Sequence, residues 1–147
     1  MMGRFRLRFW RSEHDMEEPM NIGQAAAASG VAAKMIRHYE QIGLVRAPKR
    51  TASNYRSYSH EEVHVLRFVK RARTLGFSMA DIRALLALWQ NKGRSSASVK
   101  KIAGRHVADL KQKIAETQSM VAALEHLARN CHGDARPECP ILDDLAR

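Results

Sequence analysis

The sequence predicts a mainly α-helical protein made of a small helical head with a β wing, one long helix, and a C-terminal loop with a short final helix. Three observations lead to this division. Short helical patterns with capping residues occupy 20–90, apolar residues follow a heptad spacing within 96–130, and both cysteines of the chain lie within 131–147. A chain of 147 residues has room for one small domain plus such a helix, and it is too short for a typical two-domain enzyme.

Residues 1–19 show no consistent helical or strand period and end in Glu17-Glu18-Pro19. We expect a disordered N-terminal extension, with Met20 or Met16 as the natural start. Arginines interrupt its apolar residues, so it lacks the core of a secretory signal. The chain also has no run of about 18 apolar residues that could span a membrane. The expected compartment is therefore the reducing cytoplasm.

Two short helices begin the head. Asn21 caps a first helix that ends at Gly30, and a second helix is expected from Ala32 to Ile42. Its expected core positions are Ala32, Met35, Tyr39 and Ile42, and its expected outer positions are Lys34, Arg37, His38 and Gln41. This pattern is typical of a helix-turn-helix whose second helix enters the major groove of DNA. A helical hairpin with a solvated basic face is the alternative.

A β wing is expected after the second helix. Positions 44–45 and 55–58 would form two short strands, with turn-forming residues between them. Alternation along the second strand puts Arg56 and Tyr58 on the same side. Arg50 and Arg56 on such a wing would be placed to clamp DNA phosphates, which fixes the position of a protein on DNA without reading sequence.

Two further helices complete the head. A capping box at Ser59–Glu62 opens the first, which runs up to Gly76, and Ser78 caps the second, Met79 to Gln90. Their expected buried positions are Val63, Leu66, Val69 and Ala72 on the first helix, and Ile82, Leu85, Leu86 and Trp89 on the second.

The positive charge of the chain is concentrated in the head. Residues 20–75 hold ten Lys and Arg against three Glu, a net charge of +7, out of +10 for the whole chain. A charge of this density is the electrostatic footprint of a protein that binds a phosphate backbone.

The long helix carries an apolar seam whose members are spaced alternately by four and three residues: Ala103, Val107, Leu110, Ile114, Thr117, Val121, Leu124 and Ala128. No other segment of the chain is long enough to cover it. The expected partner is the same helix of a second copy, giving a two-fold homodimer that addresses a palindromic DNA site. Packing onto the helices of 60–90 is the alternative.

Cys131 and Cys139 enclose a short loop that contains Gly133 and Pro137, and such a loop can fold back and bring two thiolates together. Two thiolates suit soft ions such as copper(I) and silver, and also zinc. Two unrelated free cysteines, or a disulfide, are the other interpretations of this spacing.

Taken together, the segments from Met20 onward resemble the MerR family of transcription regulators, and most closely its copper-efflux regulator branch. The matching pieces are MNIGQAAAASGV, IRHYEQIGLV, NYRSY, RARTLGFSMADIRALL and CxxxxxxxCPI. The resemblance implies a homodimer joined by antiparallel long helices, a coiled coil, bound to double-stranded promoter DNA. It also implies that metal binding makes the dimer distort the promoter so that RNA polymerase can use it, which activates efflux or detoxification genes.

The resemblance also implies roles for individual residues. The expected DNA-binding residues are Lys34, Arg37 and Tyr39 on the second helix, and Arg50, Tyr55 and Arg56 on the wing. Cys131 and Cys139 would be the metal ligands. Relatives selective for divalent ions carry a cysteine where this chain has Ser96, so two thiolates remain here, which favours copper(I), silver(I) or gold(I) as effector. Lys100 would offset the residual negative charge of the site.

Several rival hypotheses keep the same residues in other roles. A regulator of the same fold could sense zinc, cadmium or lead, or use the two thiols as a reversible redox pair. A thiol metal-buffer protein would explain the cysteines but not the basic head. His132, where the family resemblance predicts proline, adds an imidazole that could widen metal selectivity or could simply face solvent. No motif in the sequence supports an enzyme.

Overall fold

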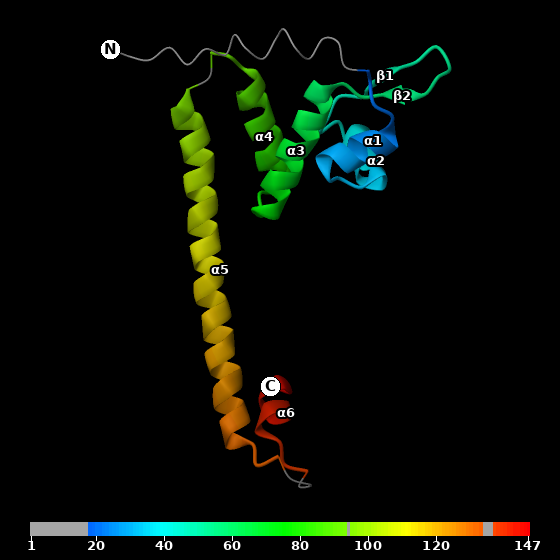
Figure 1. Ribbon diagram of the computed structural model, residues 1–147. Helices are drawn as coiled ribbons and strands as arrows, with labels where there is room; N and C mark the ends of the chain where they lie inside the picture. The colour runs from blue at the N-terminus through cyan, green and yellow to red at the C-terminus, as the bar shows by residue number, and fades with distance from the viewer. Residues whose placement is uncertain (1–17, 94, 134–136) are drawn as a thin grey trace. The chain divides into compact units, whose positions relative to one another are not determined.

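The computed structural model describes residues 18–93, 95–133 and 137–147, so most of the expected N-terminal extension lies outside the described residues. The chain forms two compact units, Met1–Gly93 and Arg94–Arg147. The first contains four helices and a two-stranded wing, and the second contains one long and one short helix (Figure 1). The mainly helical fold with a small wing agrees with the expected class.

The first two helices form the expected helix-turn-helix. Helix α1, Ile22–Ser29, is capped by Asn21, whose Oδ1 accepts from the Gln24 amide at 2.9 Å, and Gly30 ends it in the left-handed conformation. Helix α2, Ala33–Gln41, follows directly. Both cap predictions are therefore confirmed.

The core face of α2 differs from the predicted one. Ile36 and Tyr39 are its buried residues, whereas Met35 and Ile42 are 39% and 37% exposed. Ala32 is exposed as well. Tyr39 is thus buried as predicted, Ile36 is buried in place of Met35, and Val31, which precedes the helix, belongs to the same core.

The wing consists of β1, Lys49–Arg50, and β2, Arg56–Ser57, paired antiparallel with Lys49 opposite Ser57. The prediction that 44–45 form the first strand is wrong. Leu44 is instead buried, and its amide donates to the carbonyl of Tyr39 at 2.9 Å, so this segment closes the end of α2.

Helices α3, His60–Thr74, and α4, Met79–Gln90, have the predicted starts and caps. The predicted buried positions of α3 and three of those of α4 lie in the core: Val63, Leu66, Val69, Ala72, Ile82, Leu85 and Leu86. Trp89 is the exception, since it is 40% exposed and stacks on Phe68 with ring centroids 5.0 Å apart. Trp89 lies in the last turn of α4, at the end of the helix.

The second unit contains α5, Ser96–Asn130, and α6, Pro140–Leu145. Helix α5 has 35 residues, so it is about 50 Å long, and none of its residues is buried. Helix α6 folds back beside the C-terminal end of α5 (Figure 1). In the part of the chain that the structure describes, no helix combines the length and apolarity needed to cross a bilayer.

Replacing Gly30 by alanine is expected to lower the free energy of unfolding by about 1 kcal/mol, because Gly30 has a φ of +71°, a conformation that strains residues with a Cβ. The new Cβ would also displace the Lys70 ammonium. Urea unfolding followed by circular dichroism would measure the change. Gly104→Ala, in the N-terminal third of α5 with open space around the added Cβ, is the control and should not destabilise. Equal effects of the two substitutions would contradict the expectation.

Candidate nucleic-acid interface and cysteine loop

The outer face of α2 presents basic side chains to solvent. Lys34, Arg37 and His38 all lie on the side of α2 away from its buried residues, and α2 is flanked by the wing. Tyr39 points the other way and is 6% exposed. The burial of Tyr39 fits a role in packing α2 onto the core. Little of the Tyr39 side chain is left exposed to contact DNA.

The tip of the wing is held by its own hydrogen bonds. Arg50 Nη1 donates to the carbonyl of Asn54 at 2.9 Å, and the Thr51 amide donates to the carbonyl of Tyr55 at 2.8 Å. Asn54 has a φ of 64°, a left-handed conformation that asparagine tolerates in tight turns. Tyr55, 72% exposed, projects from this tip. Arg50 and Tyr55 therefore share one solvent-exposed end of the wing.

Arg56 and Tyr58 lie on the same side of the wing, as predicted, and both contact Glu40 of α2. Arg56 Nε donates to Glu40 Oε2 at 3.1 Å, and the Tyr58 hydroxyl donates to Glu40 Oε1 at 2.5 Å. Burial, together with the hydrogen bond to Glu40, raises the pKa of Tyr58 above its ordinary value, while Arg56 and Arg37 oppose the shift. Tyr58 is therefore protonated at neutral pH and remains a hydrogen-bond donor.

One arginine on α3 and one on α4 bind backbone carbonyls at the C-terminal ends of α1 and α2. Arg67 Nε donates to the carbonyl of Ala28 at 2.8 Å, near the end of α1. Arg83 donates to the carbonyls of Ile42 and Gly43 at 3.0 and 2.9 Å, just after α2. The Arg67 contact satisfies a carbonyl in the last turn of α1 that lacks an intrahelical partner, and the Arg83 contacts satisfy carbonyls of the turn that follows α2. Sequence reasoning missed them, because the partners are about 40 residues apart and share no local pattern.

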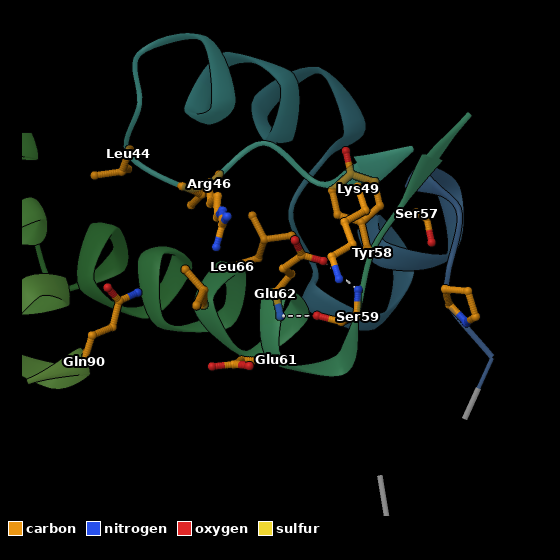
Figure 2. A pocket seen from close by; sticks show the side chains of 13 residues that line it. Leu44, Arg46, Lys49, Ser57, Tyr58, Ser59, Glu61, Glu62, Leu66 and Gln90 are labelled. Carbon is orange, nitrogen blue, oxygen red and sulfur yellow. Dashed lines mark hydrogen bonds between the residues drawn. The ribbon is translucent and has the colours of Figure 1, made fainter. Parts of the chain in front are cut away.

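A cavity of about 900 Å³ opens between the segment after α2 and the start of α3. Figure 2 shows Arg46 directed into it from the loop, with Glu61 and Glu62 on α3. The Glu62 carboxylate already accepts from the Ser59 amide at 2.7 Å, and the Glu62 amide donates to the Ser59 hydroxyl at 3.2 Å. This wall of the cavity is thus formed by the capping box of α3, whose polar groups are satisfied locally.

The two cysteines lie at the two ends of the C-terminal loop. Cys131 is the residue at which α5 ends, and Cys139 directly precedes Pro140 at the start of α6. Both are free thiols and both are partly exposed. Gly133 has a φ of 63°, which allows the chain to reverse after Cys131. Residues 134–136 of this loop lie outside the described part of the chain.

Besides the two cysteines, the loop sequence contains His132, Asp134 and Glu138 as other residue types that can bind metals. Among the residues that the structure describes, no group of three or more His, Cys, Asp and Glu side chains is close enough together to hold a metal ion. The role of Cys131 and Cys139 as metal ligands stays a prediction from the sequence, and a pair of thiolates would suit a soft ion.

Ser96 and Lys100 lie in the first turns of α5, and both are exposed. Ser95, not Ser96, caps this helix, since its hydroxyl accepts from the Ala97 amide at 3.1 Å. Cys131 follows the opposite end of the same helix, about 50 Å away. Within one chain, Ser96 and Lys100 are therefore too far from the cysteine loop to contact an ion there.

Comparison with known proteins identifies the family. Residues 20–89 match the family described as "MerR HTH family regulatory protein", and residues 63–127 match "MerR, DNA binding". The HTH-type transcriptional regulator HmrR of Sinorhizobium medicae (strain WSM419) is 55% identical over 128 residues, which are 87% of this chain and 87% of that protein. The chain belongs to the MerR family of transcriptional regulators. Since these relatives regulate transcription, the expectation that the chain is not an enzyme is confirmed.

Two further comparisons describe how far the MerR likeness extends. The heavy metal-dependent transcription regulator 1 of Rhizobium meliloti (strain 1021) is 56% identical over 128 residues, which are 86% of this chain and 87% of that protein. The crystal structure of PbrR691 from Ralstonia metallidurans CH34 in complex with lead(II) superposes with a TM-score of 0.77 at 28% identity, covering 86% of this chain and 98% of PbrR691. The MerR likeness therefore spans both units of the chain.

Proposed function

We propose that this protein is a metal-responsive transcription regulator of the MerR family, which binds promoter DNA as a homodimer and activates metal-efflux or detoxification genes when copper(I), silver(I) or gold(I) binds Cys131 and Cys139. The observation that carries the proposal is the pair of free, partly exposed thiols that end α5 and precede α6. A heavy metal-dependent regulator at 56% identity supports a metal as effector.

The DNA contacts in this proposal come from α2 and the wing. Lys34 and Arg37 on the outer face of α2 would enter the major groove, and Tyr39 would support α2 from the core side. Arg50, Tyr55 and Arg56 would contact the phosphate backbone from the wing. Metal binding would shift the bound dimer into a form that distorts the promoter, and RNA polymerase would then use the realigned DNA in the cytoplasm.

Dimerisation in the proposal rests on α5. Its apolar seam is exposed, with Val107, Ile114 and Leu124 at 49%, 56% and 55%. An antiparallel coiled coil of two α5 helices would cover these side chains. The same arrangement would bring the Ser96 end of one helix beside the cysteine loop of the other copy.

Selectivity for a monovalent ion follows from the ligands in this arrangement. Two thiolates can hold a +1 ion in linear coordination, leaving a net charge of −1, whereas zinc and similar ions take three or four ligands. Ser96 of the facing helix would offer a hydroxyl in place of a third thiolate. Lys100, one turn further along, would lie on the same side and offset the negative charge.

Anaerobic titration of the reduced protein tests this proposal, using copper(I) and zinc in separate experiments against chelators of known affinity. We expect tight binding of one copper(I) per subunit and weak binding of zinc. Ser96→Cys should strengthen zinc binding by about tenfold or more, because it adds a third thiolate to the site. Ala97→Cys adds a thiol one residue away and is the matched control, for which no gain is expected.

Each contrary outcome points to a defined rival. Wild-type protein that binds zinc as tightly as copper(I) would be a divalent-ion sensor, and the Ser96 reasoning would be wrong. Protein that binds neither ion, but changes its DNA complex on oxidation of the two thiols, would be a dithiol redox sensor. Metal binding without sequence-specific DNA binding would leave a thiol metal buffer.

A further inference from the structure

The Glu40 carboxylate joins the recognition helix α2 to the wing. One oxygen accepts from the Tyr58 hydroxyl and the other from Arg56 Nε, at 2.5 and 3.1 Å. The Glu40 side chain is 7% exposed, so little of it remains open to solvent. A carboxylate on a DNA-binding helix repels phosphates unless it is paired, and here it is paired on both oxygens.

The pairing engages only the inner edge of the Arg56 guanidinium. Nε contacts Glu40, and in the ranges 18–93, 95–133 and 137–147 neither terminal amino group of Arg56 has a hydrogen-bond partner. The Arg56 side chain is 33% exposed. Because the guanidinium is planar, a contact at Nε fixes the direction in which the remaining N–H groups point. This fork matches the oxygens of a phosphate.

Tyr58 in turn fixes Glu40. It is 2% exposed, and its backbone amide and carbonyl pair with those of Met20 at 2.8 and 2.9 Å. The position of its hydroxyl is therefore set by the core of the head. The three side chains form a continuous path from the core, through a carboxylate on α2, to an arginine on the wing.

We propose that Glu40 is a positioning residue for DNA binding: held by Tyr58, it orients Arg56 so that the terminal amino groups of Arg56 meet a DNA phosphate. This inference rests on the DNA-binding role proposed above for Arg56. It also predicts a change in DNA affinity opposite to the one that charge alone would give. Removing an acidic residue from a DNA-binding surface should strengthen binding by simple electrostatics, whereas removing Glu40 should weaken it.

The test is a double-mutant cycle with Glu40→Ala, Arg56→Ala and the double variant, measured on a duplex that the wild-type protein selects from a random pool. We expect each single substitution to lower affinity on the order of tenfold, since it removes a charge-assisted hydrogen bond. In the Arg56→Ala background, Glu40→Ala should have almost no further effect, because it acts through Arg56. Arg56→Ala should also reduce the slope of log affinity against log salt by about 0.9 for each phosphate that Arg56 neutralises in the wild-type complex.

Two more variants separate positioning from folding. Glu61→Ala removes an exposed carboxylate from the first turn of α3 and is the charge control, for which equal or tighter binding is expected. Glu40→Gln keeps a hydrogen-bonding side chain for both partners and should restore part of the affinity. Thermal unfolding of each variant ensures that affinities are compared on folded protein.

The inference is overturned if Glu40→Ala tightens binding as Glu61→Ala does, or if it costs the same affinity with and without Arg56. The first result would make Glu40 an ordinary repulsive charge, and the second would make it a structural residue independent of Arg56. If wild-type protein enriches no duplex from the pool, the proposed function itself fails. That failure is distinguishable because it appears before any substitution is made.

Discussion

Ile114→Lys is expected to convert the proposed dimer to a monomer and to lower its affinity for a two-fold symmetric duplex by at least about 100-fold, because the two heads would then bind independently. Ile114 lies next to the midpoint of α5 and is 56% exposed in the single chain. In an antiparallel pair of full-length overlap, the two copies of residue 114 meet near the two-fold axis, so two lysines would face each other there.

Sedimentation velocity would measure the oligomeric state, and fluorescence anisotropy of a labelled duplex would measure affinity. Ser119→Lys adds the same charge to the same helix but outside the apolar seam, and it should leave both quantities unchanged. A dimeric Ile114→Lys protein, or a Ser119→Lys protein that dissociates, would show that this seam is not the dimer interface.

Cys131→Ser is expected to lower copper(I) affinity by at least about 100-fold, since even the loss of residues that only support metal ligands costs about 10–100-fold. A hydroxyl is a poor ligand for a soft monovalent ion. Metal-dependent transcription from the target promoter should disappear with it. DNA binding should persist, because Cys131 belongs to the second unit and the basic face of α2 to the first.

Chelator competition and transcription in vitro measure these two effects separately. His132→Ala is the matched control, because it alters the exposed neighbour of Cys131 and leaves both thiols intact. If copper(I) affinity falls equally in Cys131→Ser and His132→Ala, His132 is a third ligand. Affinity retained in Cys131→Ser would place the site elsewhere.

The sequence predicts the helices of this fold well because their ends carry local signals. Asn21, Ser59 and Ser78 each accept a hydrogen bond from the backbone amide three residues further along the helix that they start, and such contacts depend only on residues nearby. The long helix is equally predictable, since its heptad spacing continues over most of its length.

The predictions fail where contacts outside an element decide its orientation. Helix α2 buries Ile36, in one core with Val31 from outside the helix, while the predicted Met35 is 39% exposed. Leu44 follows α2 in an apolar pair that resembles a strand, yet its amide closes that helix and its side chain is buried. Helical periodicity cannot show either effect, because both depend on how neighbouring segments pack.

The candidate site is predictable in residue type more than in geometry. The two cysteines and the basic face of α2 can be found in the sequence. In the structure the cysteines are partly exposed, and the basic residues of α2 are exposed. The link from Glu40 to Arg56 cannot be found there, because the two residues are separated by 16 positions and join a helix to a strand. Only the folded arrangement brings them together.

The arginine contacts at the ends of α1 and α2 bear on how the head opens. Short helices normally fray from their ends, and their terminal amides then exchange with solvent long before the whole domain unfolds. Here Arg67 and Arg83 tie both carboxyl ends to helices that follow later in the chain. Amide exchange near these ends should therefore require global unfolding of the head, which would make the head one cooperative unit. A peptide of α1 and α2 alone should not fold stably.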